Sequence, residues 1–355
     1  MSVDAHMKKI LIVNAQLPFV YGGAEYVADR LKNKLCEFGH RADIVRIPFK
    51  WYPSERIPDH ILAARLLDLT QASGEDVDLV IGLKFPAYYI RHPNKVLWVL
   101  HQFRQVYDLW GTPYQDFQAT QEGLAIKDIV IHSDNTFLRE AKKTYAISKV
   151  VAKRMRDFNG IDATPLYPPV DEADLYHDER CGDYLFFPSR LNMIKRQELA
   201  MLSMKYVKTG ARLVIAGKPD STQYASYLQG VIKKNGLGGK VDLVFDMTEA
   251  QKISCFANAL GCLFVPYGED YGYVTLESFY SKKPVITCAD SGGPCDFVED
   301  GINGYVVPPE PEAIAQAIDG LYSDKKGAVR LGKAGYDKLK ALDITWDKVI
   351  RSLVA

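Results

Sequence analysis

The sequence of 355 residues lacks several features that mark common functional classes. It contains no apolar run near the roughly 20 residues of a membrane-spanning helix, and its start does not have the layout of a signal peptide. Its 44 basic and 44 acidic residues cancel, so no global charge indicates a nucleic-acid or membrane partner. This composition is typical of a globular protein, and we expect the protein to be cytoplasmic.

Patterns that bind metal ions are also missing. The six cysteines are scattered and show no paired spacing of the kind that holds zinc, which favours buried free thiols in a reducing compartment. The Asp-x-Asp motif Asp76-Val77-Asp78 comes before an apparent strand, at the end away from the expected ligand site. We interpret it as a solvated loop and predict no metal site.

The chain is long enough for two domains of ordinary size. Residues 1–6, followed by Met7, look like a vector-derived leader before a native start at Met7. The adjacent prolines Pro168 and Pro169 forbid a helix and indicate a linker. We expect an α/β fold with two Rossmann-like, doubly wound domains at residues 7–168 and 169–340, facing a central cleft, and a C-terminal helix at residues 341–355.

Short runs of branched apolar residues predict buried parallel strands, and segments of helical spacing separate them. In the first half, the expected strands are Lys9–Asn14, Ala42–Ile47, Leu79–Ile81, Val96–Leu100 and Thr144–Ile147, with a helix at Ala24–Phe38. In the second half, they are Tyr184–Phe187, Arg212–Ala216, Val241–Phe245, Cys262–Val265 and Pro284–Thr287.

The most informative stretch follows the expected strand Cys262–Val265, because ligands of open α/β sheets bind beyond the carboxyl ends of the strands. A glycine there allows a helix to begin close to a ligand, and the first N–H groups of that helix suit a pyrophosphate. The residues expected at this anion site are Tyr271, Gly272, Tyr273 and Val274. A carboxylate can accept hydrogen bonds from two neighbouring hydroxyl groups, so Glu277 suits a ribose and Glu269 suits a hexose. Alternatively, both are solvated charges on an amphipathic helix.

Three further clusters also follow expected strands. The turn Gly292-Gly293 leaves room for a phosphate, or is simply a tight loop. Arg190 and Lys195 offer a guanidinium fork and a point charge for a diphosphate, although two surface cations near a strand end are ordinary. The pair Gly22-Gly23 in the first domain would face the other clusters across the cleft.

Taken together, these motifs resemble one known family. Their order is Gly-Gly-Ala-Glu from Gly22, Ser-Arg-Leu from Ser189 with Lys195, Glu269 and Glu277, Pro-Val-Ile from Pro284, Gly292-Gly293, and Glu-Asp-Gly-Ile-Asn-Gly-Tyr from Glu299. This order is similar to that of the retaining glycosyltransferases of family 4, which have the GT-B fold. The resemblance covers nearly the whole chain from Met7 onward.

The resemblance implies a role for each cluster. Arg190 and Lys195 would bind the diphosphate of a nucleoside-diphosphate-sugar donor, Glu277 its ribose, and Glu269 the transferred sugar. The amides of Gly22-Gly23 and Gly292-Gly293 would line the diphosphate and sugar sites, and the last helix would cross back onto the first domain.

His101 ends an expected first-domain strand, where the family often has a histidine that touches the donor sugar. It is also plausible as a hydrogen-bonded wall of the cleft. Two positions depart from the family pattern: Ser189 stands where glycine is common, and Asp296 stands where glutamate is usual. These departures weaken any transfer of donor specificity.

The expected reaction needs no metal ion and no cofactor besides the donor substrate. Departure of a nucleoside diphosphate builds negative charge on phosphate, which Arg190, Lys195 and a helix N-terminus would stabilise. The resemblance implies retention of the anomeric configuration, with attack of the acceptor hydroxyl on the same face. It also implies a glycan or lipid-linked acceptor in polysaccharide biosynthesis.

Other functions stay open on the residues alone. A glycoside hydrolase could use Glu269 and Glu277 as its two carboxylates, but it would not need Arg190 and Lys195. A nucleotide-sugar epimerase, a glycan phosphorylase and a non-catalytic nucleotide-sugar-binding protein are further alternatives on the same fold. A nicotinamide oxidoreductase is disfavoured because the first βα turn lacks G-x-G-x-x-G.

Two more segments each have two interpretations. A basic cluster before the linker suits either peripheral association with an anionic membrane or, preferably, a solvated helix face. Its members are Lys142, Lys143, Lys149, Lys153, Arg154 and Arg156. The aromatic-rich segment Phe103–Tyr114 suits either an acceptor site or core packing.

Overall fold

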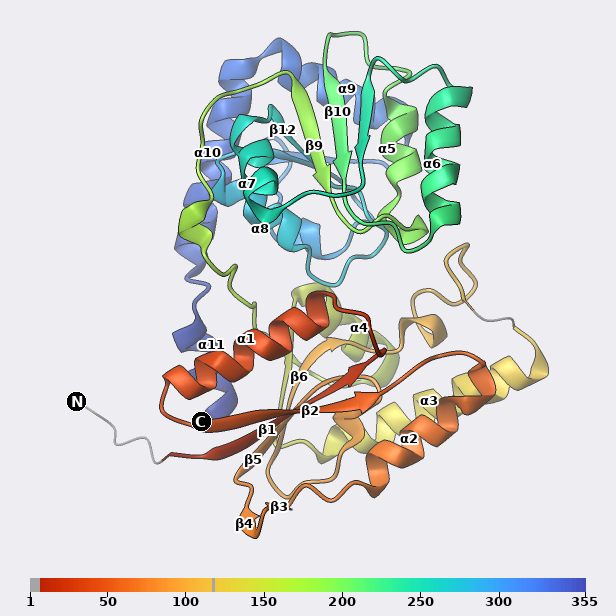
Figure 1. Cartoon of the computed structure of the whole chain (residues 1–355), viewed down its shortest axis with the longest axis vertical. Helices are drawn as coiled ribbons and strands as arrows, with labels where there is room; N and C mark the ends of the chain where they lie inside the picture. Colours follow the sequence, from red (N-terminus) through yellow and green to blue (C-terminus); the bar gives the residue numbers. More distant parts are fainter. Residues whose placement is uncertain (1–6, 117–118) are drawn as a thin grey trace. The chain divides into compact units, whose positions relative to one another are not determined.

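The computed structural model describes residues 7–116 and 119–355, which form two compact units (Figure 1). Unit 1 contains the chain up to Pro169 together with Thr345–Ala355, and unit 2 contains Val170–Ile344. The division falls directly after the adjacent prolines Pro168-Pro169. The expected leader at residues 1–6 lies outside the described residues.

Unit 1 is built on a parallel sheet with the strand order β2-β1-β5-β6-β7-β8. Its strands are β1 (Lys9–Gln16), β2 (Arg41–Pro48), β5 (Leu79–Lys84), β6 (Lys95–His101), β7 (Lys143–Ala146) and β8 (Thr164–Pro165). The hairpin strands β3 (Gln71–Ala72) and β4 (Glu75–Asp76) lie outside this sheet. Its helices are α1 (Gly23–Glu37), α2 (Ile57–Leu66), α3 (Gln121–Phe137), α4 (Lys149–Asn159) and α11 (Trp346–Val354).

A buried polar network fixes the region that follows the central strands of unit 1. The carboxylate of Asp134, on α3, accepts hydrogen bonds from the hydroxyls of Tyr88 (2.8 Å), Tyr89 (2.7 Å) and Tyr107 (2.6 Å). Burial raises the pKa of Asp134, against these hydrogen bonds, which lower it. Because Tyr88 and Tyr89 follow β5 and Tyr107 follows β6, the network joins the exits of both strands to α3.

Unit 2 repeats this architecture with a parallel sheet in the order β11-β10-β9-β12-β13-β14. Its strands are β9 (Tyr184–Pro188), β10 (Arg212–Ala216), β11 (Val241–Val244), β12 (Gly261–Leu263), β13 (Val285–Cys288) and β14 (Gly304–Val307). Its helices are α5 (Gln197–Ser203), α6 (Thr222–Lys234), α7 (Glu249–Asn258), α8 (Tyr273–Tyr280), α9 (Pro311–Ser323) and α10 (Lys325–Leu342). Helices α5 and α6 lie on one side of the sheet and α7 and α8 on the other (Figure 1).

The strand order of unit 2 contains a topological switch point beside β9. The chain runs from β9 to β10 on one side and later returns to β12 on the other side. Helices that leave adjacent strands in opposite directions open a crevice at the carboxyl edge of such a sheet. The loops after β9, β10, β12 and β13 are therefore the places where a ligand would be held.

The C-terminal helix α11 packs on unit 1, although unit 2 separates it from the rest of unit 1 in the sequence. Its apolar face buries Val349, Ile350 and Leu353. The backbone oxygen of Ser352 accepts a hydrogen bond from the Tyr145 hydroxyl at 3.0 Å. Apolar spacing predicts such a helix, but not the surface that it covers.

The two parallel sheets confirm the expected doubly wound architecture, with a few local differences. Strand β14 was not expected, because its residues were interpreted only as a motif. Asp76 lies in the short strand β4, where a loop was expected. The prediction of buried thiols holds for Cys262 and Cys288 and is wrong for Cys36, which is exposed; all six cysteines are free.

Among residues 7–116 and 119–355, no helix has the length and apolar content required to cross a membrane.

Candidate functional site

An ion pair between Lys195 and Glu269 forms the centre of the candidate site in unit 2. Lys195 ends a short 3₁₀ turn after β9, and its N–H group donates to the side-chain oxygen of Asn192. Glu269 lies in the loop after β12. The two side chains are only 15% and 21% exposed. Residues far apart in the sequence, both predicted to bind a donor, are thus brought together at the carboxyl edge of the sheet.

The loop that carries Glu269 is joined to the loop that carries Gly292 and Gly293. The N–H groups of Gly268 and Glu269 donate to the oxygens of Asp290 and Ser291, both at 2.8 Å. The N–H group of Gly293 donates back to the oxygen of Glu269 at 2.7 Å. Three backbone hydrogen bonds therefore join the two loops, and two of them fix the backbone of Glu269 itself.

This close approach explains the two glycines. Gly292 has φ of +77°, and a Cβ atom there would lie 2.5 Å from the backbone oxygen of Glu269. A Cβ atom on Gly293 would lie 2.4 Å from the backbone oxygen of Tyr271. Both glycines are thus needed for contact between the loops, whether or not a phosphate also lies against them.

Helix α8 begins beside this pair of loops at Tyr273, and the residue before it, Gly272, has φ of +85°. Since glycine has no side chain to cap a helix, the first amides of α8, which include that of Val274, are suited to an anion. The Tyr271 side chain is 3% exposed, and its ring packs edge-on against Tyr273 at 4.9 Å between centroids. The ring of Tyr271 is therefore packed inside unit 2 and is not available to a ligand in this conformation.

A cavity of about 270 Å³ adjoins the start of α8. Its walls include Pro188, Ser189, Gly217, Lys218, Val274 and Glu277. These residues come from the carboxyl ends of β9 and β10 and from α8, which is the position expected of a ligand at the switch point.

The acidic wall of this cavity is balanced by Lys252 of α7. Its ammonium group lies 3.0 Å from the carboxylate of Glu277 and 2.7 Å from that of Glu249. Burial lowers the pKa of Lys252, but the two carboxylates raise it by more, so the net shift is upward and the lysine stays charged. Burial, Glu277 and Glu249 raise the pKa of Tyr176, whose hydroxyl donates to Glu249 at 3.0 Å.

Arg190 is not drawn into the Lys195–Glu269 pair. Its guanidinium lies 3.5 Å from the carboxylate of Asp220, and the two side chains are 56% and 46% exposed. The structure therefore places the two predicted diphosphate ligands on the same loop after β9 but in different ion pairs.

Three predicted residues lie in unit 1. Gly22 caps α1, and its N–H group donates to the carboxylate of Glu25 at 3.0 Å. Nothing lies within 4 Å of a Cβ atom placed on Gly23, so packing does not require glycine there. His101 ends β6, with its Nδ1 atom 2.9 Å from the backbone oxygen of Gln102.

Glu25 also forms a nearly buried ion pair with Lys84, at the end of β5, at 2.9 Å. Burial raises the pKa of Glu25, but the Lys84 ammonium group and hydrogen bonds lower it by more, so the carboxyl stays ionised. The pair fixes the start of α1 to the carboxyl end of β5, which is the edge where the predicted unit 1 residues lie.

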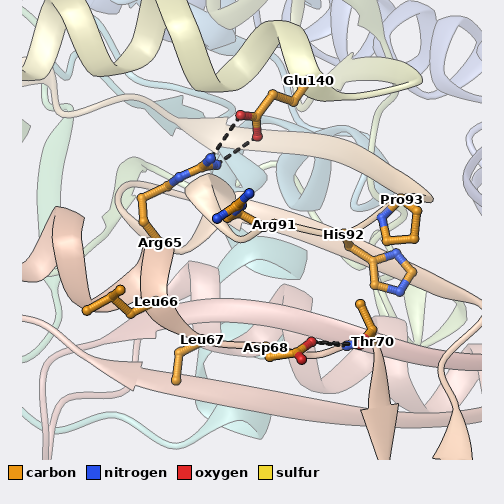
Figure 2. Close-up of a pocket in the computed structure, with 9 residues that line it drawn as sticks. All are labelled: Arg65, Leu66, Leu67, Asp68, Thr70, Arg91, His92, Pro93 and Glu140. Atoms are coloured by element: carbon orange, nitrogen blue, oxygen red, sulfur yellow. Dashed lines mark hydrogen bonds and ion pairs between the residues drawn. The ribbon is translucent and has the colours of Figure 1, made fainter.

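A second cavity, of about 570 Å³, lies in unit 1 and contains none of the predicted residues (Figure 2). Arg91, His92 and Pro93, which line it, precede β6, whereas His101 ends that strand. Its Arg65 is held by both oxygens of Glu140, at 2.7 and 3.0 Å. Because the cavity lies at the amino end of β6, it is separate from the expected ligand edge.

The basic cluster and the aromatic-rich segment, each of which had two interpretations, can now be compared with the structure. In the basic cluster, Lys153 pairs with Asp157, Arg154 with Asp108, and Arg156 with Asp162. Lys153 and Arg156 are 74% and 67% exposed on α4, as expected of a solvated helix face, whereas Arg154 is only 11% exposed and Lys143 lies in strand β7. In the aromatic-rich segment, Phe103, Val106, Tyr107 and Leu109 are buried, which favours core packing.

No group of three or more histidine, cysteine, aspartate or glutamate side chains in the described ranges 7–116 and 119–355 has an arrangement that could hold a metal ion.

The sequence analysis did not identify several residues of the candidate site. Gly217 and Lys218 directly follow β10, so the rule that ligands lie beyond strand ends was sufficient to find them. Lys252 and Arg196 gave no comparable signal, because a lysine on an amphipathic helix and an arginine after a lysine are ordinary surface residues.

Three comparisons identify similar proteins. Residues 181–338 match the family described as glycosyl transferases group 1. The human alpha-1,3/1,6-mannosyltransferase ALG2 is 27% identical in an alignment 214 residues long that covers 54% of this chain and 51% of that protein. The chain thus spans about half the length of this curated relative.

Solved structures show the same fold over the whole chain. Sucrose-phosphate synthase from Thermosynechococcus elongatus superposes with a TM-score of 0.79 at 16% identity, covering 97% of both chains. Anabaena HepE, solved in complex with UDP and glucose, superposes with a TM-score of 0.71 at 16% identity, covering 98% of this chain and 99% of HepE. The expected GT-B fold is therefore confirmed.

Proposed function

The C-terminal unit of this chain belongs to the group 1 glycosyltransferases, and from this premise we propose that the protein transfers a sugar from a nucleoside-diphosphate-sugar to a hydroxyl group of a glycan or lipid-linked acceptor. One observation carries the proposal. The Lys195–Glu269 ion pair lies next to the loop that leads into α8, whose start adjoins the cavity lined by Glu277. A cation and a helix N-terminus suit the phosphates of such a donor. A cavity lined by a carboxylate suits its ribose.

The charges of the site suit departure of a nucleoside diphosphate. Negative charge develops on the leaving phosphate, where Lys195 and the amides at the start of α8 would stabilise it. Arg190 would add a guanidinium fork by exchanging Asp220 for phosphate oxygens. We propose that these groups act without a divalent metal ion and without a cofactor.

Glu269 is proposed to accept hydrogen bonds from hydroxyl groups of the transferred sugar. Its pairing with Lys195 and the two hydrogen bonds of its backbone hold its carboxylate in one place, as orientation of a reacting sugar requires. We propose that Gly22, Gly23 and His101 of unit 1 also contact the donor. Space beside Gly23 supports that role.

Retention of the anomeric configuration is part of the proposal and follows from the family resemblance. In this route the acceptor hydroxyl attacks the anomeric carbon on the face from which the diphosphate leaves, and its proton passes to the departing phosphate oxygen. The human relative is named as a mannosyltransferase, so mannose belongs among the donor sugars to be tested.

The first experiment is a thermal-shift screen against UDP, GDP, ADP and their glucose, mannose and N-acetylglucosamine conjugates, with and without EDTA. A ligand that binds only the folded state raises the unfolding temperature, so one nucleotide series should raise it in the presence of EDTA. A shift that EDTA abolishes would contradict metal independence. Absence of any shift would contradict the donor site itself.

Transfer is then distinguished from the alternatives by product. A transferase releases the nucleoside diphosphate and yields a glycosylated acceptor, whereas an epimerase converts the donor without an acceptor. A non-catalytic binding protein would show the thermal shift with no turnover of donor. Free sugar released from a simple glycoside would favour a hydrolase.

A further inference from the structure

Arg196, the residue after Lys195, has a backbone conformation that residues other than glycine rarely adopt. Its φ is +56°, in the left-handed region, and it lies between the 3₁₀ turn Met193–Lys195 and helix α5. A non-glycine residue in this region is strained, and such strain persists where the surrounding contacts compensate for it.

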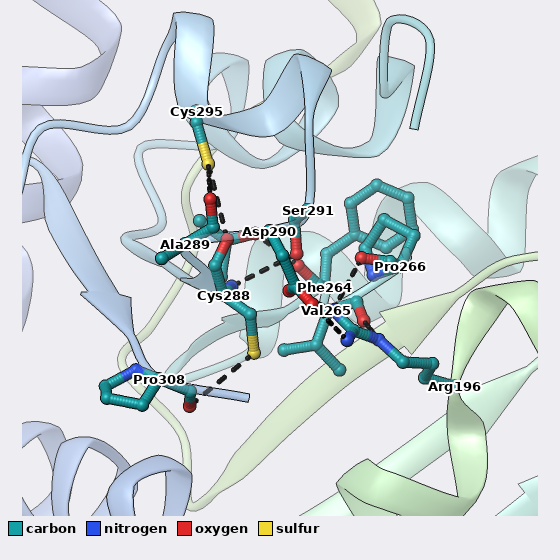
Figure 3. Close-up of polar contacts among 11 residues, drawn as sticks. Arg196, Phe264, Val265, Pro266, Cys288, Ala289, Asp290, Ser291, Cys295 and Pro308 are labelled. Carbon is teal, nitrogen blue, oxygen red and sulfur yellow. Dashed lines mark hydrogen bonds and ion pairs between the residues drawn. The ribbon is translucent and has the colours of Figure 1, made fainter. Parts of the chain in front are cut away.

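The Arg196 side chain makes those contacts (Figure 3). Its guanidinium binds both carboxylate oxygens of Asp290, at 2.6 and 2.8 Å. It also donates to the backbone oxygens of Val265 at 2.7 Å and Pro266 at 2.8 Å. The side chain is 9% exposed, so these charge-assisted hydrogen bonds are largely shielded from water.

These contacts join three segments of the candidate site. Arg196 directly follows Lys195; Val265 and Pro266 begin the loop that carries Glu269; and Asp290 begins the loop that carries Gly292. The hydrogen bonds described above between the loops after β12 and β13 run through their backbones, and the Arg196 side chain adds hydrogen bonds to both loops from the segment that carries Lys195.

The geometry points to Arg196 as a positioning residue, which holds Lys195 and Glu269 in the relative placement that the transfer reaction needs. It acts through its neighbours and is not expected to touch the donor. Its effect on turnover rests on the proposed function, whereas its effect on loop order does not.

Arg196→Gly is the most informative variant. Glycine adopts a positive φ without strain, so the backbone conformation is favoured while the guanidinium is removed. If Arg196 served only the backbone turn, this variant would behave like the wild type or better. Arg196→Lys keeps the charge but loses the planar fork, and should retain part of the wild-type loop order and turnover.

Lys282→Gly is the matched control. Lys282 also lies in unit 2 with a left-handed φ of +51°, but its side chain is exposed. The control therefore relieves the same kind of backbone strain without removing a buried guanidinium.

The first readout is hydrogen exchange of the full-length protein without ligand. Arg196→Gly should speed exchange of the Gly268, Glu269 and Gly293 amides at least tenfold relative to wild type, because their hydrogen bonds join the loops that Arg196 ties together. Lys282→Gly should leave these amides unchanged. Unchanged protection of all three amides in Arg196→Gly would overturn the positioning role.

The second readout is release of nucleoside diphosphate from whichever UDP, GDP or ADP sugar the wild type turns over. Arg196→Gly should lower kcat on the order of 10-fold to 100-fold, with the affinity for the free nucleotide changed by less than about threefold. Equal losses of kcat and nucleotide affinity, or a kcat like that of Lys282→Gly, would contradict positioning. If the wild type turns over none of the donors while the amides respond as expected, the proposed function fails and the loop clamp stands.

Discussion

At the residue scale, the charged side chains of the site differ in how firmly they are held. The Arg190–Asp220 pair is exposed, and pairs of this kind contribute about 0–1 kcal/mol. A ligand anion can therefore replace Asp220 at little cost. Lys195, Glu269 and Arg196 are shielded from water and have fixed partners, so their positions are set before any ligand binds.

The first prediction concerns Lys195 and Glu269. Lys195→Ala and Glu269→Ala should each lower turnover by at least about 100-fold, because each removes a charge assigned to the reacting end of the donor. Both side chains lie in loops outside the apolar core, so the free energy of unfolding should fall by only about 1–2 kcal/mol. Steady-state kinetics with the donor found in the nucleotide screen and urea unfolding measure the two effects.

Lys325→Ala provides the control, because Lys325 pairs with Asp183 in the same unit at a more exposed position. It should leave turnover unchanged. Turnover at the wild-type rate in either Lys195→Ala or Glu269→Ala would remove that residue from the proposed site.

At the scale of elements, the site depends on two loops that pack backbone against backbone. Gly292→Ala should displace the loop after β13, because its Cβ atom would lie 2.5 Å from the Glu269 oxygen at a φ of +77°. We expect a loss of stability of about 2–4 kcal/mol from the overlap and backbone strain together, and a loss of activity. Thermal unfolding and donor turnover test this prediction.

Gly301→Ala separates the two causes. Gly301 has a similar φ of +70°, but a Cβ atom there meets nothing within 4 Å. It should therefore show only the strain, of about 1 kcal/mol, with normal activity. Equal effects of the two substitutions would show that contact between the loops is unimportant.

His40, in the turn between α1 and β2, is expected to make the free energy of unfolding depend on pH. Burial and the nearby Lys8 charge lower the pKa of His40, so the folded protein favours the neutral imidazole. The stability from this preference is present above the unfolded pKa of about 6.5 and is lost as the pH falls below it. The free energy of unfolding should therefore decrease from pH 7 to pH 5.

His40→Gln should flatten this dependence in urea unfolding measured at several pH values. Part of the slope should remain, because burial also lowers the pKa of His60 in the same unit. An unchanged slope in His40→Gln would assign the pH dependence to other groups.

At the scale of the whole molecule, the two ends of the chain contribute to one core. Ile350 of α11 is 2% exposed and packs within unit 1, so Ile350→Ala should destabilise unit 1 by about 2–5 kcal/mol. Hydrogen exchange should quicken in α1, which α11 contacts. The effect should thus appear at the opposite end of the sequence.

Ile318→Ala, in helix α9, is the counterpart in unit 2, where Ile318 is fully buried. Its exchange effects should concentrate in unit 2. Faster exchange in unit 2 and unchanged exchange in α1 for Ile350→Ala would contradict the placement of α11.

The sequence by itself determined the fold class, the site loops and most of the strands. Parallel strands buried on both faces are continuous apolar runs, as in Tyr184–Phe187, and the expected strand Arg212–Ala216 has the bounds of β10. Strand β14 was not predicted because its glycine and polar neighbours interrupt the apolar run. Glycines and charges after the strand ends marked the loops, because chain direction alone brings those ends to one edge of a sheet.

Only the tertiary structure decided how the charges pair. Lys195 could have met any carboxylate near that edge, and its pairing with Glu269 depends on how the loops after β9, β12 and β13 pack together. The roles of Lys252 and Arg196 likewise follow from distances across the fold, since an ion pair is defined by space and local sequence patterns describe only near neighbours along the chain. The same holds for α11, whose apolar stripe fixes that it must be buried but leaves open which surface covers it.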